Sequence, residues 1–462
     1  MQTWIEQELA SSNFGDLRLR RRFCRIVEKL SQSPNSTVPE ASRSWAATKA
    51  TYNFWDSAKV SVERIIAPHL QATLRRAQGQ KRILAVQDTS LFDWTHHPAT
   101  TGLGCGGASY LHGIHVHSTL AVSTEGVPLG LLAQEQWTRP IEDHGKSANC
   151  KKRPVSDKES QKWLTALTAT HKHIDTHVEI ITCCDREADF WELFSAERPA
   201  NSQLLIRAGQ NRRVVDPDAQ ENLLLFTQAQ QIHCLGNMTV TIGHSGSRVA
   251  RKALVTVKAM KIELMPPQTR EKQPAIALTL VVAEEDHAPE GTTPIRWLLL
   301  TTLPIETFED AVECVQYYSF RWLIERYHYT LKSGCQVESL QLETAQRLEK
   351  ALATYCIVAW RLLWLLYHER SHPDDSCECV LETYQWQALY CSIHQTTQLP
   401  ENTPTLQEAT IWIARLGGFL ARKGDGKPGV KTLWRGWKHL DDIAETWKLA
   451  KSLPNNIQGA YG

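Results

Sequence analysis

The strongest constraint on the fold is a change in hydrophobic periodicity near residue 80. Up to about residue 70, apolar residues recur at helical spacing, and turn-forming runs such as Ser33-Pro34-Asn35-Ser36 separate the segments. Five short runs with the composition of strands follow, at residues 81–88, 114–123, 127–136, 177–185 and 203–208. Helical spacing at 157–171 and 187–197 separates the later runs. Three strands therefore come first, and the other two alternate with helices.

This order of elements predicts an α/β fold with a ribonuclease-H-like core. Strand patterning returns over about 214–303 and predicts an all-β insertion. Helical spacing then resumes and runs through two long segments, 307–332 and 342–370, before a helical tail. We expect three domains: a helical domain at 1–70, the α/β domain with its insertion at 71–370, and a helical domain at 371–462.

The composition is that of a globular protein, with 42% hydrophobic and 22% charged residues. No apolar run approaches the roughly 20 residues that a membrane span needs. The first 16 residues lack a basic stretch followed by an apolar segment and a small-residue cleavage site, so no secretion signal is predicted. We therefore expect a cytoplasmic protein without a membrane partner.

The chain has 12 cysteines, and their placement favours reduced thiols over disulfides. Cys183 and Cys184 are adjacent in a predicted buried strand, and most of the others are scattered. One cluster, Cys377-Glu378-Cys379, lies near His368 and His372, but it lacks the paired C-x-x-C spacing of a structural zinc site. Core thiols are the favoured interpretation.

The net charge of +1, from 51 basic and 50 acidic residues, does not by itself indicate nucleic-acid binding. The distribution of charge along the chain is more informative, because basic residues cluster near both ends. The N-terminal stripe consists of Arg18, Arg20, Arg21, Arg22 and Arg25, and the C-terminal one of Arg422, Lys423, Lys427, Lys431, Arg435 and Lys438, beside Trp434 and Trp437. Basic side chains interleaved with aromatic ones suit a phosphate backbone. Such runs are, however, more often ordinary solvated surface.

Two aspartates end predicted central strands. Asp88 ends the apolar run in AVQD, and Asp185 ends IITCCD. A carboxylate buried at such a place costs several kcal/mol unless something compensates it, and ligand sites of α/β sheets lie at strand ends. Because a single strand-ending Asp is usually a helix cap or turn residue, a third carboxylate is needed to favour a functional site.

That third carboxylate is predicted in the segment YSFRWLIERYHYTLK. Tyr318, Arg321, Glu325 and Lys332 are spaced so that, on one continuous helix, they fall within an arc of roughly 60°. Four polar groups in one stripe indicate a functional face. The alternative is a surface ion-pair ladder, because Arg321 and Glu325 are an (i, i+4) pair.

Three carboxylates from two strand ends and one helix suit hard cations such as Mg²⁺, with Mn²⁺ as a substitute, because these ions prefer oxygen ligands. Two such ions activate an attacking water or 3′-hydroxyl and stabilise the leaving oxygen of an in-line displacement. The predicted chemistry is phosphoryl transfer. Arg321 and Lys332 would then contact DNA phosphates.

With these residues in view, the chain resembles the DDE transposases of bacterial insertion-sequence family four over nearly its whole length. The most specific match is the signature Y-x2-R-x3-E-x6-K, which Tyr318, Arg321, Glu325 and Lys332 satisfy. Further similar stretches are Asp185-Arg186-Glu187-Ala188-Asp189, Lys158-Glu159-Ser160, Lys162-Trp163-Leu164, Trp297-Leu298-Leu299-Leu300-Thr301 and Ala414-Arg415-Leu416-Gly417-Gly418-Phe419.

The resemblance implies a cut-and-paste DNA transposase with Asp88, Asp185 and Glu325 as its catalytic metal ligands. It implies that the N-terminal domain binds double-stranded transposon ends, and that C-terminal helices support a homodimer on DNA. The implied pathway nicks an end, forms a hairpin, opens it with water, and joins the end to target DNA. Such an enzyme would act in the bacterial cytoplasm, at the nucleoid.

The resemblance also implies DNA-contacting residues. Trp297 matches a tryptophan that receives a flipped base, and stacking on an aromatic ring is a reasonable way to hold one; a core tryptophan is the alternative. Arg186 and Arg207 resemble positions that contact phosphates, although either could pair with a buried carboxylate. Trp322 and the signature residue Tyr318 complete the expected DNA contacts.

Three alternatives remain at this stage. A nonspecific metal-dependent nuclease would need the three carboxylates without the flanking domains. A transposase-derived binding protein would keep the basic surfaces and lose cleavage. A structural assembly without a DNA role would leave the strand-end acids unexplained.

Overall fold

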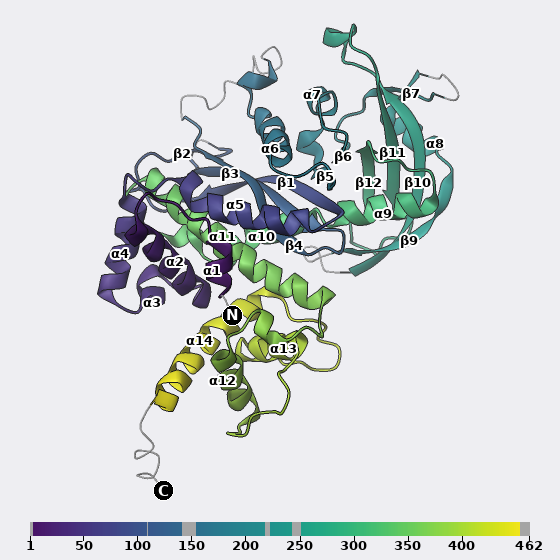
Figure 1. Ribbon diagram of the computed structural model, residues 1–462. Helices are drawn as coiled ribbons and strands as arrows, with labels where there is room; N and C mark the ends of the chain where they lie inside the picture. Colours follow the sequence, from purple (N-terminus) through teal and green to yellow (C-terminus); the bar gives the residue numbers. More distant parts are fainter. Residues whose placement is uncertain (1–2, 109, 141–153, 218–221, 243–250, 453–462) are drawn as a thin grey trace. The chain divides into compact units, whose positions relative to one another are not determined.

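The computed structural model describes residues 3–108, 110–140, 154–217, 222–242 and 251–452 (Figure 1). The chain divides into two compact units. The first, called here the helical unit, consists of residues 1–72, 92–114 and 326–462. The second, the sheet unit, consists of residues 73–91 and 115–325.

The N-terminal region is helical, as predicted. Its helices are α1 (Trp4–Glu8), α2 (Leu17–Gln32), α3 (Val38–Ser42), α4 (Trp45–Asp56) and α5 (Val62–Gln78). Side-chain oxygens of Asp16 and Ser44 accept backbone N–H groups at the first turns of α2 and α4, which explains where these helices begin. Phe14, Phe23 and Phe54 pack together with ring centroids 5.3–5.6 Å apart, and they form the centre of this region.

The C-terminal region is helical too, and it packs with the N-terminal helices inside the helical unit. Its helices are α11 (Ala345–Ser371), α12 (Thr383–His394), α13 (Leu406–Leu416) and α14 (Val430–Ser452). Helix α11 contacts α2, α4, α13 and α14. Arg43, at the end of α3, donates to Asp441 (2.6 Å) and Asp442 (2.8 Å) of α14.

Among the described residues, α11 alone is long and apolar enough to meet the length and composition criteria for a membrane span. This corrects the expectation that no such segment exists. Of its most apolar window, 78% is buried inside the structure, so contacts with the neighbouring helices account for its apolar character.

The sheet unit contains the predicted strands, arranged in a large mixed sheet. Strands before the insertion are β1 (Arg82–Asp93), β2 (Gly104–Cys105), β3 (His112–Ser123), β4 (Pro128–Trp137), β5 (Glu179–Cys184) and β6 (Ser202–Arg207). Of these, β2, the last two residues of β1 and the first three of β3 belong to the helical unit. Strand β4 pairs with β3, and the order then runs β3-β1-β5-β6. Strands β1, β5 and β6 are parallel. Helix α6 (Gln161–His171) separates β4 from β5, and its Trp163 and Leu167 are buried against the sheet core.

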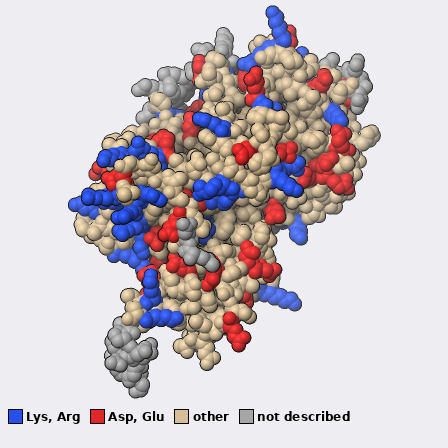
Figure 2. Space-filling model, in the orientation of Figure 1, with Lys and Arg blue, Asp and Glu red and all other residues tan. Residues whose placement is uncertain are grey.

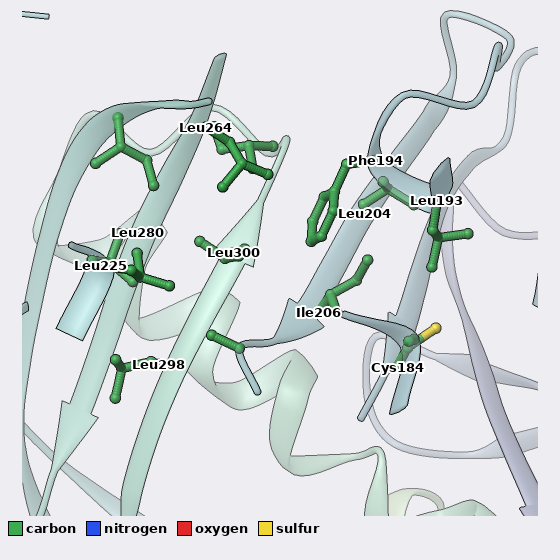
Figure 3. Packing of buried hydrophobic residues seen from close by; sticks show 14 of the residues in the cluster. Cys184, Leu193, Phe194, Leu204, Ile206, Leu225, Leu264, Leu280, Leu298 and Leu300 are labelled. Carbon is green, nitrogen blue, oxygen red and sulfur yellow. The ribbon is translucent and has the colours of Figure 1, made fainter. Parts of the chain in front are cut away.

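The insertion continues this sheet. Its strands are β7 (Arg213–Val215), β8 (Asn222–Leu224), β9 (Cys234–Ile242), β10 (Arg251–Leu264), β11 (Ile276–Glu284) and β12 (Arg296–Thr301). Strand β12 pairs antiparallel with β6, and β11 and β10 follow. Leu280 and Leu300 of the insertion and Leu204 and Ile206 of β6 lie in one buried cluster (Figure 3). The insertion therefore shares the core of the sheet.

Two expectations about this unit are wrong. The insertion is not all-β, because α8 (Leu225–Gln231) buries Leu225 and Ala229 in the same cluster. The helix predicted at 187–197 is divided into a 3-10 turn, η4 (Arg186–Ala188), and a short helix, α7 (Trp191–Phe194). The break falls at Asp189, whose side chain binds the backbone of another loop instead of continuing a helix.

Candidate active site

Asp88 and Asp185 come from neighbouring parallel strands. The register of β1 and β5 pairs Val86 with Cys183, and each aspartate lies two residues further along its strand. Because adjacent strands are about 4.8 Å apart and residues in register point to the same face, this arrangement brings the two aspartates side by side. Asp185 directly follows β5, as expected. Strand β1 continues to Asp93, so Asp88 lies within it and not at its end.

The electrostatics of Asp185 agree with this proximity. Burial raises the pKa of the Asp185 carboxyl above its ordinary value, and the Asp88 carboxylate raises it further. The backbone N–H of Glu187 donates to Asp185 at 2.9 Å and lowers that pKa. Arg321 and Lys162 lower it as well. Two carboxylates and two cationic side chains therefore share one neighbourhood.

Glu325 lies in the first turn of α10 (Trp322–Tyr329), where it forms an ion pair with Arg321. The side chains of Arg321 and Glu325 are 16% and 33% exposed. Burial lowers the pKa of Arg321, but Tyr318 and acidic neighbours raise it by more and leave that pKa above its ordinary value. These neighbours include both Glu325 and Asp88. Arg321 therefore links the carboxylate on the helix to the carboxylate pair at the strands.

The four signature residues do not share one continuous helix, which corrects the predicted 60° arc. Helix α9 (Phe308–Ser319) contains Tyr318, and a turn at residues 320–321 separates it from α10. Lys332 lies in a π-helical segment, η6 (Thr330–Gly334), where rotation per residue differs from that of an α-helix. Tyr318 and Arg321 lie in the sheet unit with the three carboxylates, and Lys332 lies in the helical unit. There, its ammonium is 3.6 Å from Glu338 and 5.2 Å from the centre of the Phe92 ring.

An aromatic and cationic surface lies next to these carboxylates. Trp297 of β12 is half-buried, and its ring meets Tyr318 edge to face, with centroids 5.2 Å apart. Burial lowers the pKa of Arg207, Tyr318 raises it, and Arg186 and Arg321 lower it further. Three guanidinium groups are thus close enough to repel one another, an arrangement that favours binding of an anion.

Arg186 and Trp322 occupy different environments. Arg186 is exposed in η4, and its backbone packs closely on Gly209, where an added Cβ would lie 3.1 Å from the Arg186 carbonyl oxygen. Trp322 begins α10 and is half-buried. Arg207 donates to the carbonyl of Arg296 at 3.0 Å. Among the described residues of the sheet unit, no carboxylate forms an ion pair with Arg186 or Arg207, so both cations are suited to an anionic ligand.

Two contributing residues had no assigned role from the sequence. Lys162 of α6 has a side chain only 10% exposed, lies 5.5 Å from the Trp137 ring centre, and interacts electrostatically with Asp88 and Asp185. Burial lowers the pKa of Lys162, while Glu187 and other acidic neighbours raise it. The sequence signal was its place in the family-like stretch Lys162-Trp163-Leu164, but no spacing rule connects that helix with the strand ends.

Asp189 positions the loop that carries Asp185. Its carboxylate accepts the backbone N–H groups of Gly209 (2.7 Å) and Gln210 (2.8 Å) and pairs with Arg212 (2.9 Å). The Asp189 side chain has no exposed surface. This buried set of contacts joins the loop after β5 to the loop after β6, and so fixes Asp185 relative to Arg207.

Two basic surfaces of the helical unit have different characters. In α2, Arg18, Arg20, Arg21 and Arg25 are exposed, and Figure 2 shows blue side chains gathered over the N-terminal helices. The C-terminal basic run is less available. Lys427 pairs with Glu369 and Arg422 with Asp425, and Trp434 is buried at 3% exposure. Trp434 is therefore a core residue and does not line a DNA surface, whereas Trp437 is half-buried and Lys431 and Arg435 are exposed. DNA binding by this run stays a prediction.

Comparison with known families gives two matches, one at each end of the chain. Residues 1–60, which include the exposed α2 arginines, match the family of transposase DNA-binding domains. Residues 357–456, from the middle of α11 through α14, match the Transposase Tn5 dimerisation domain. These matches support DNA binding and the formation of a homodimer. Together, the matches of both terminal regions support a Tn5-like transposase, to which the chain is similar in its DNA-binding and dimerisation domains.

Proposed function

We propose that this protein is a cut-and-paste DNA transposase whose sheet unit has a ribonuclease-H-like core and cleaves DNA by metal-dependent phosphoryl transfer. The strand order β4-β3-β1-β5-β6, with β1, β5 and β6 parallel, supports such a core. The observation that carries the proposal is the juxtaposition of Asp88 and Asp185 in register, with Glu325 linked to them through Arg321. Three carboxylates around one guanidinium are stabilised by a further compensating cation.

The donor set fits Mg²⁺, with Mn²⁺ as a substitute. Asp88, Asp185 and Glu325 offer only oxygen atoms, which these hard cations prefer. The raised pKa of Asp185, caused by burial and by Asp88, indicates a pair of carboxylates that a cation would stabilise. When bound, the ions supply Lewis-acid activation of an attacking water or 3′-hydroxyl and neutralise the leaving oxygen.

The surrounding cations have separate roles. Arg321 neutralises Glu325 and Asp88 before the ions bind, and afterwards its guanidinium is available to a DNA phosphate. Arg186 and Arg207 hold the phosphates of the strand being cut, because they provide positive charge beside the carboxylates. Lys332 contacts a phosphate as a point charge.

The aromatic residues hold an unpaired base. Trp297 packs on the edge of Tyr318, which orients its ring. A base that leaves the duplex when a hairpin forms would stack on Trp297, and this stacking is worth about 1–3 kcal/mol. Trp322, half-buried at the start of α10, contacts the same DNA segment.

The terminal regions complete the reaction. Transposon ends bind through the N-terminal region, and the homodimer brings two ends together. The enzyme nicks each end, forms and opens a hairpin, and joins the end to target DNA in the bacterial cytoplasm, at the nucleoid. Both terminal matches weigh against a nonspecific nuclease, which would need neither region.

The test is cleavage of linear DNA that carries the candidate terminal inverted repeats, with purified protein and Mg²⁺. Hairpin and double-strand break products are expected. Asp88→Ala and Asp185→Ala should abolish cleavage and leave end binding intact, because metal ligands and phosphate contacts are separate. Asp175→Ala, an exposed acid of the same unit, is the matched control. Random nicks would identify a nuclease instead, and tight binding without cleavage by the unaltered protein would identify a DNA-binding derivative.

A further inference from the structure

Three side chains with metal-binding atoms converge at the end of α11. His368 lies in the last turn of α11, Asp375 in the loop that follows, and Cys379 at the end of η8 (Cys377–Cys379). One nitrogen, one oxygen and one sulfur atom from these side chains all lie within 4.8 Å of one another. All three residues belong to the helical unit.

The distances suit one small tetrahedral ion. Zinc binds histidine nitrogen and carboxylate oxygen at about 2.1 Å, which places two such ligand atoms about 3.4 Å apart at a tetrahedral angle. Nε2 of His368 and Oδ2 of Asp375 are 3.1 Å apart, close to that spacing. The sulfur atom of Cys379 lies within 4.8 Å of both atoms. A mixed nitrogen, oxygen and sulfur set favours zinc over Mg²⁺, which prefers oxygen ligands alone.

The His368 ring is held in place by its neighbours. It stacks between Trp364, with centroids 4.6 Å apart, and His372, at 4.7 Å. The guanidinium of Arg361 lies over the Trp364 ring, 4.4 Å from its centre. A ligand ring that is already oriented loses little freedom when it binds an ion. Asp375 and Cys379 are exposed, so an ion reaches them from solvent.

The loop that carries these residues also holds the start of α13. The carbonyl of Asp375 accepts the N–H of Leu406 at 2.6 Å, and the N–H of Cys377 donates to the carbonyl of Pro404 at 3.0 Å. Ser376 and Thr405 form a β-bridge. A bond between this loop and His368 would therefore fasten α13 to the end of α11, within the region matched to the dimerisation domain.

We propose that His368, Asp375 and Cys379 bind one zinc ion, with a water molecule as the fourth ligand, and that this ion stabilises the dimerisation region. The carboxylate and the thiolate together neutralise the charge of the ion. Binding of zinc releases the thiol proton of Cys379 to solvent, and no oxidation or reduction takes place. The site is independent of the proposed catalytic carboxylates.

The test uses the full chain, stripped of metal with a chelator and then kept in excess Mg²⁺ so that hard oxygen sites are occupied. Titration with Zn²⁺ against a chromophoric chelator should give one ion per chain. Titration with Co²⁺ should give a thiolate charge-transfer absorption band, which carboxylate sites do not produce. Zinc should also raise the unfolding temperature of the protein, because an ion that binds only the folded state stabilises it.

Cys379→Ser and Asp375→Asn change few atoms in exposed side chains and are expected to fold. Each should weaken zinc binding by at least about 100-fold, more than the loss of a supporting group alone, and Cys379→Ser should remove the cobalt band. Cys234→Ser, which alters another exposed thiol, in β9, is the matched control and should bind like the unaltered chain. Equal zinc affinity in Cys379→Ser and the unaltered chain, or the lack of a cobalt band in the latter, would overturn the proposal.

Discussion

Replacement of the buried Asp189 tests whether its contacts hold the loop after β5 against the loop after β6. Replacement by alanine removes the acceptor of the Gly209 and Gln210 N–H groups and the partner of Arg212. The side chains of Asp189 and Arg212 are 0% and 13% exposed, so water replaces these contacts poorly. Asp189→Ala therefore leaves a buried guanidinium without its counter-charge.

The expected loss of stability follows from these contacts. Breaking a buried ion pair by removing one partner costs about 3–5 kcal/mol. The two backbone N–H groups would each lose a hydrogen bond to a charged acceptor, worth about 1.5–3 kcal/mol, although the contributions overlap. We expect Asp189→Ala to lower the free energy of unfolding of the sheet unit by about 3–5 kcal/mol. Asp189→Asn keeps the shape of the side chain and one acceptor oxygen, so we expect it to lower the free energy of unfolding by only about 1–3 kcal/mol.

Urea unfolding followed by circular dichroism measures this loss, and hydrogen exchange of peptides that cover residues 205–213 locates it. Amide exchange at Gly209 and Gln210 should accelerate in Asp189→Ala. Glu187→Ala, in the same loop but with a side chain 69% exposed, is the control and should change stability by no more than about 0.5 kcal/mol. A loss below about 1 kcal/mol in Asp189→Ala, with unchanged exchange at the two amides, would refute the reasoning.

Three further outcomes are expected. Gly436→Ala should destabilise the α13 and α14 pair by about 1–3 kcal/mol or more, because the new Cβ would lie 1.7 Å from a backbone carbonyl oxygen of α13. Thermal unfolding measures this loss. Gly429→Ala is the control and should not lower the stability, because its Cβ would meet nothing within 4 Å. The hydrogen bond from Arg251 holds the pKa of Glu285 below its ordinary value. The ionised Glu285 carboxylate therefore stabilises the folded state above its unfolded pKa of about 4.3, and this stabilisation is lost as the pH falls through the lower pKa of the folded state. Unfolding measured against pH should show this loss in the unaltered chain and not in Glu285→Gln. Asp185→Asn should raise the unfolding temperature of EDTA-treated protein at pH 7, because burial and Asp88 disfavour the ionised carboxylate; a decrease would contradict the proposed carboxylate pair.

Local patterns in the sequence were sufficient for the elements of secondary structure. Strands β3, β4, β5 and β6 begin and end within two residues of their predicted bounds, and both terminal regions are helical. Hydrophobic periodicity reports which faces of an element are buried, and this property depends mainly on neighbouring residues. The motif from Asp185 to Asp189 and the four signature residues were also visible in the sequence, and they pointed to the segments in which the proposed site lies.

Local spacing failed where a distant contact overrides it. The predicted helix at 187–197 is interrupted because Asp189 binds the loop after β6, and the signature segment is divided by a turn and a π-helical stretch. Trp434 was assigned to a surface, but it lies in the core beside the Tyr329 ring, 6.0 Å away. The lack of paired C-x-x-C spacing argued against zinc near His368 and Cys379, and no spacing rule pointed to Asp375, whose carboxylate the folded chain brings within 4.8 Å of both.

The amino-acid order alone identified Asp88, Asp185 and Glu325 as candidate metal ligands, and it placed the first two at strands and the third on a helix. Only the tertiary structure decided which of them meet. Asp88 and Asp185 are 97 residues apart in the chain, and the register between β1 and β5 makes them neighbours. That register depends on side-chain packing across the whole sheet, and a shift of one residue would turn one carboxylate to the opposite face.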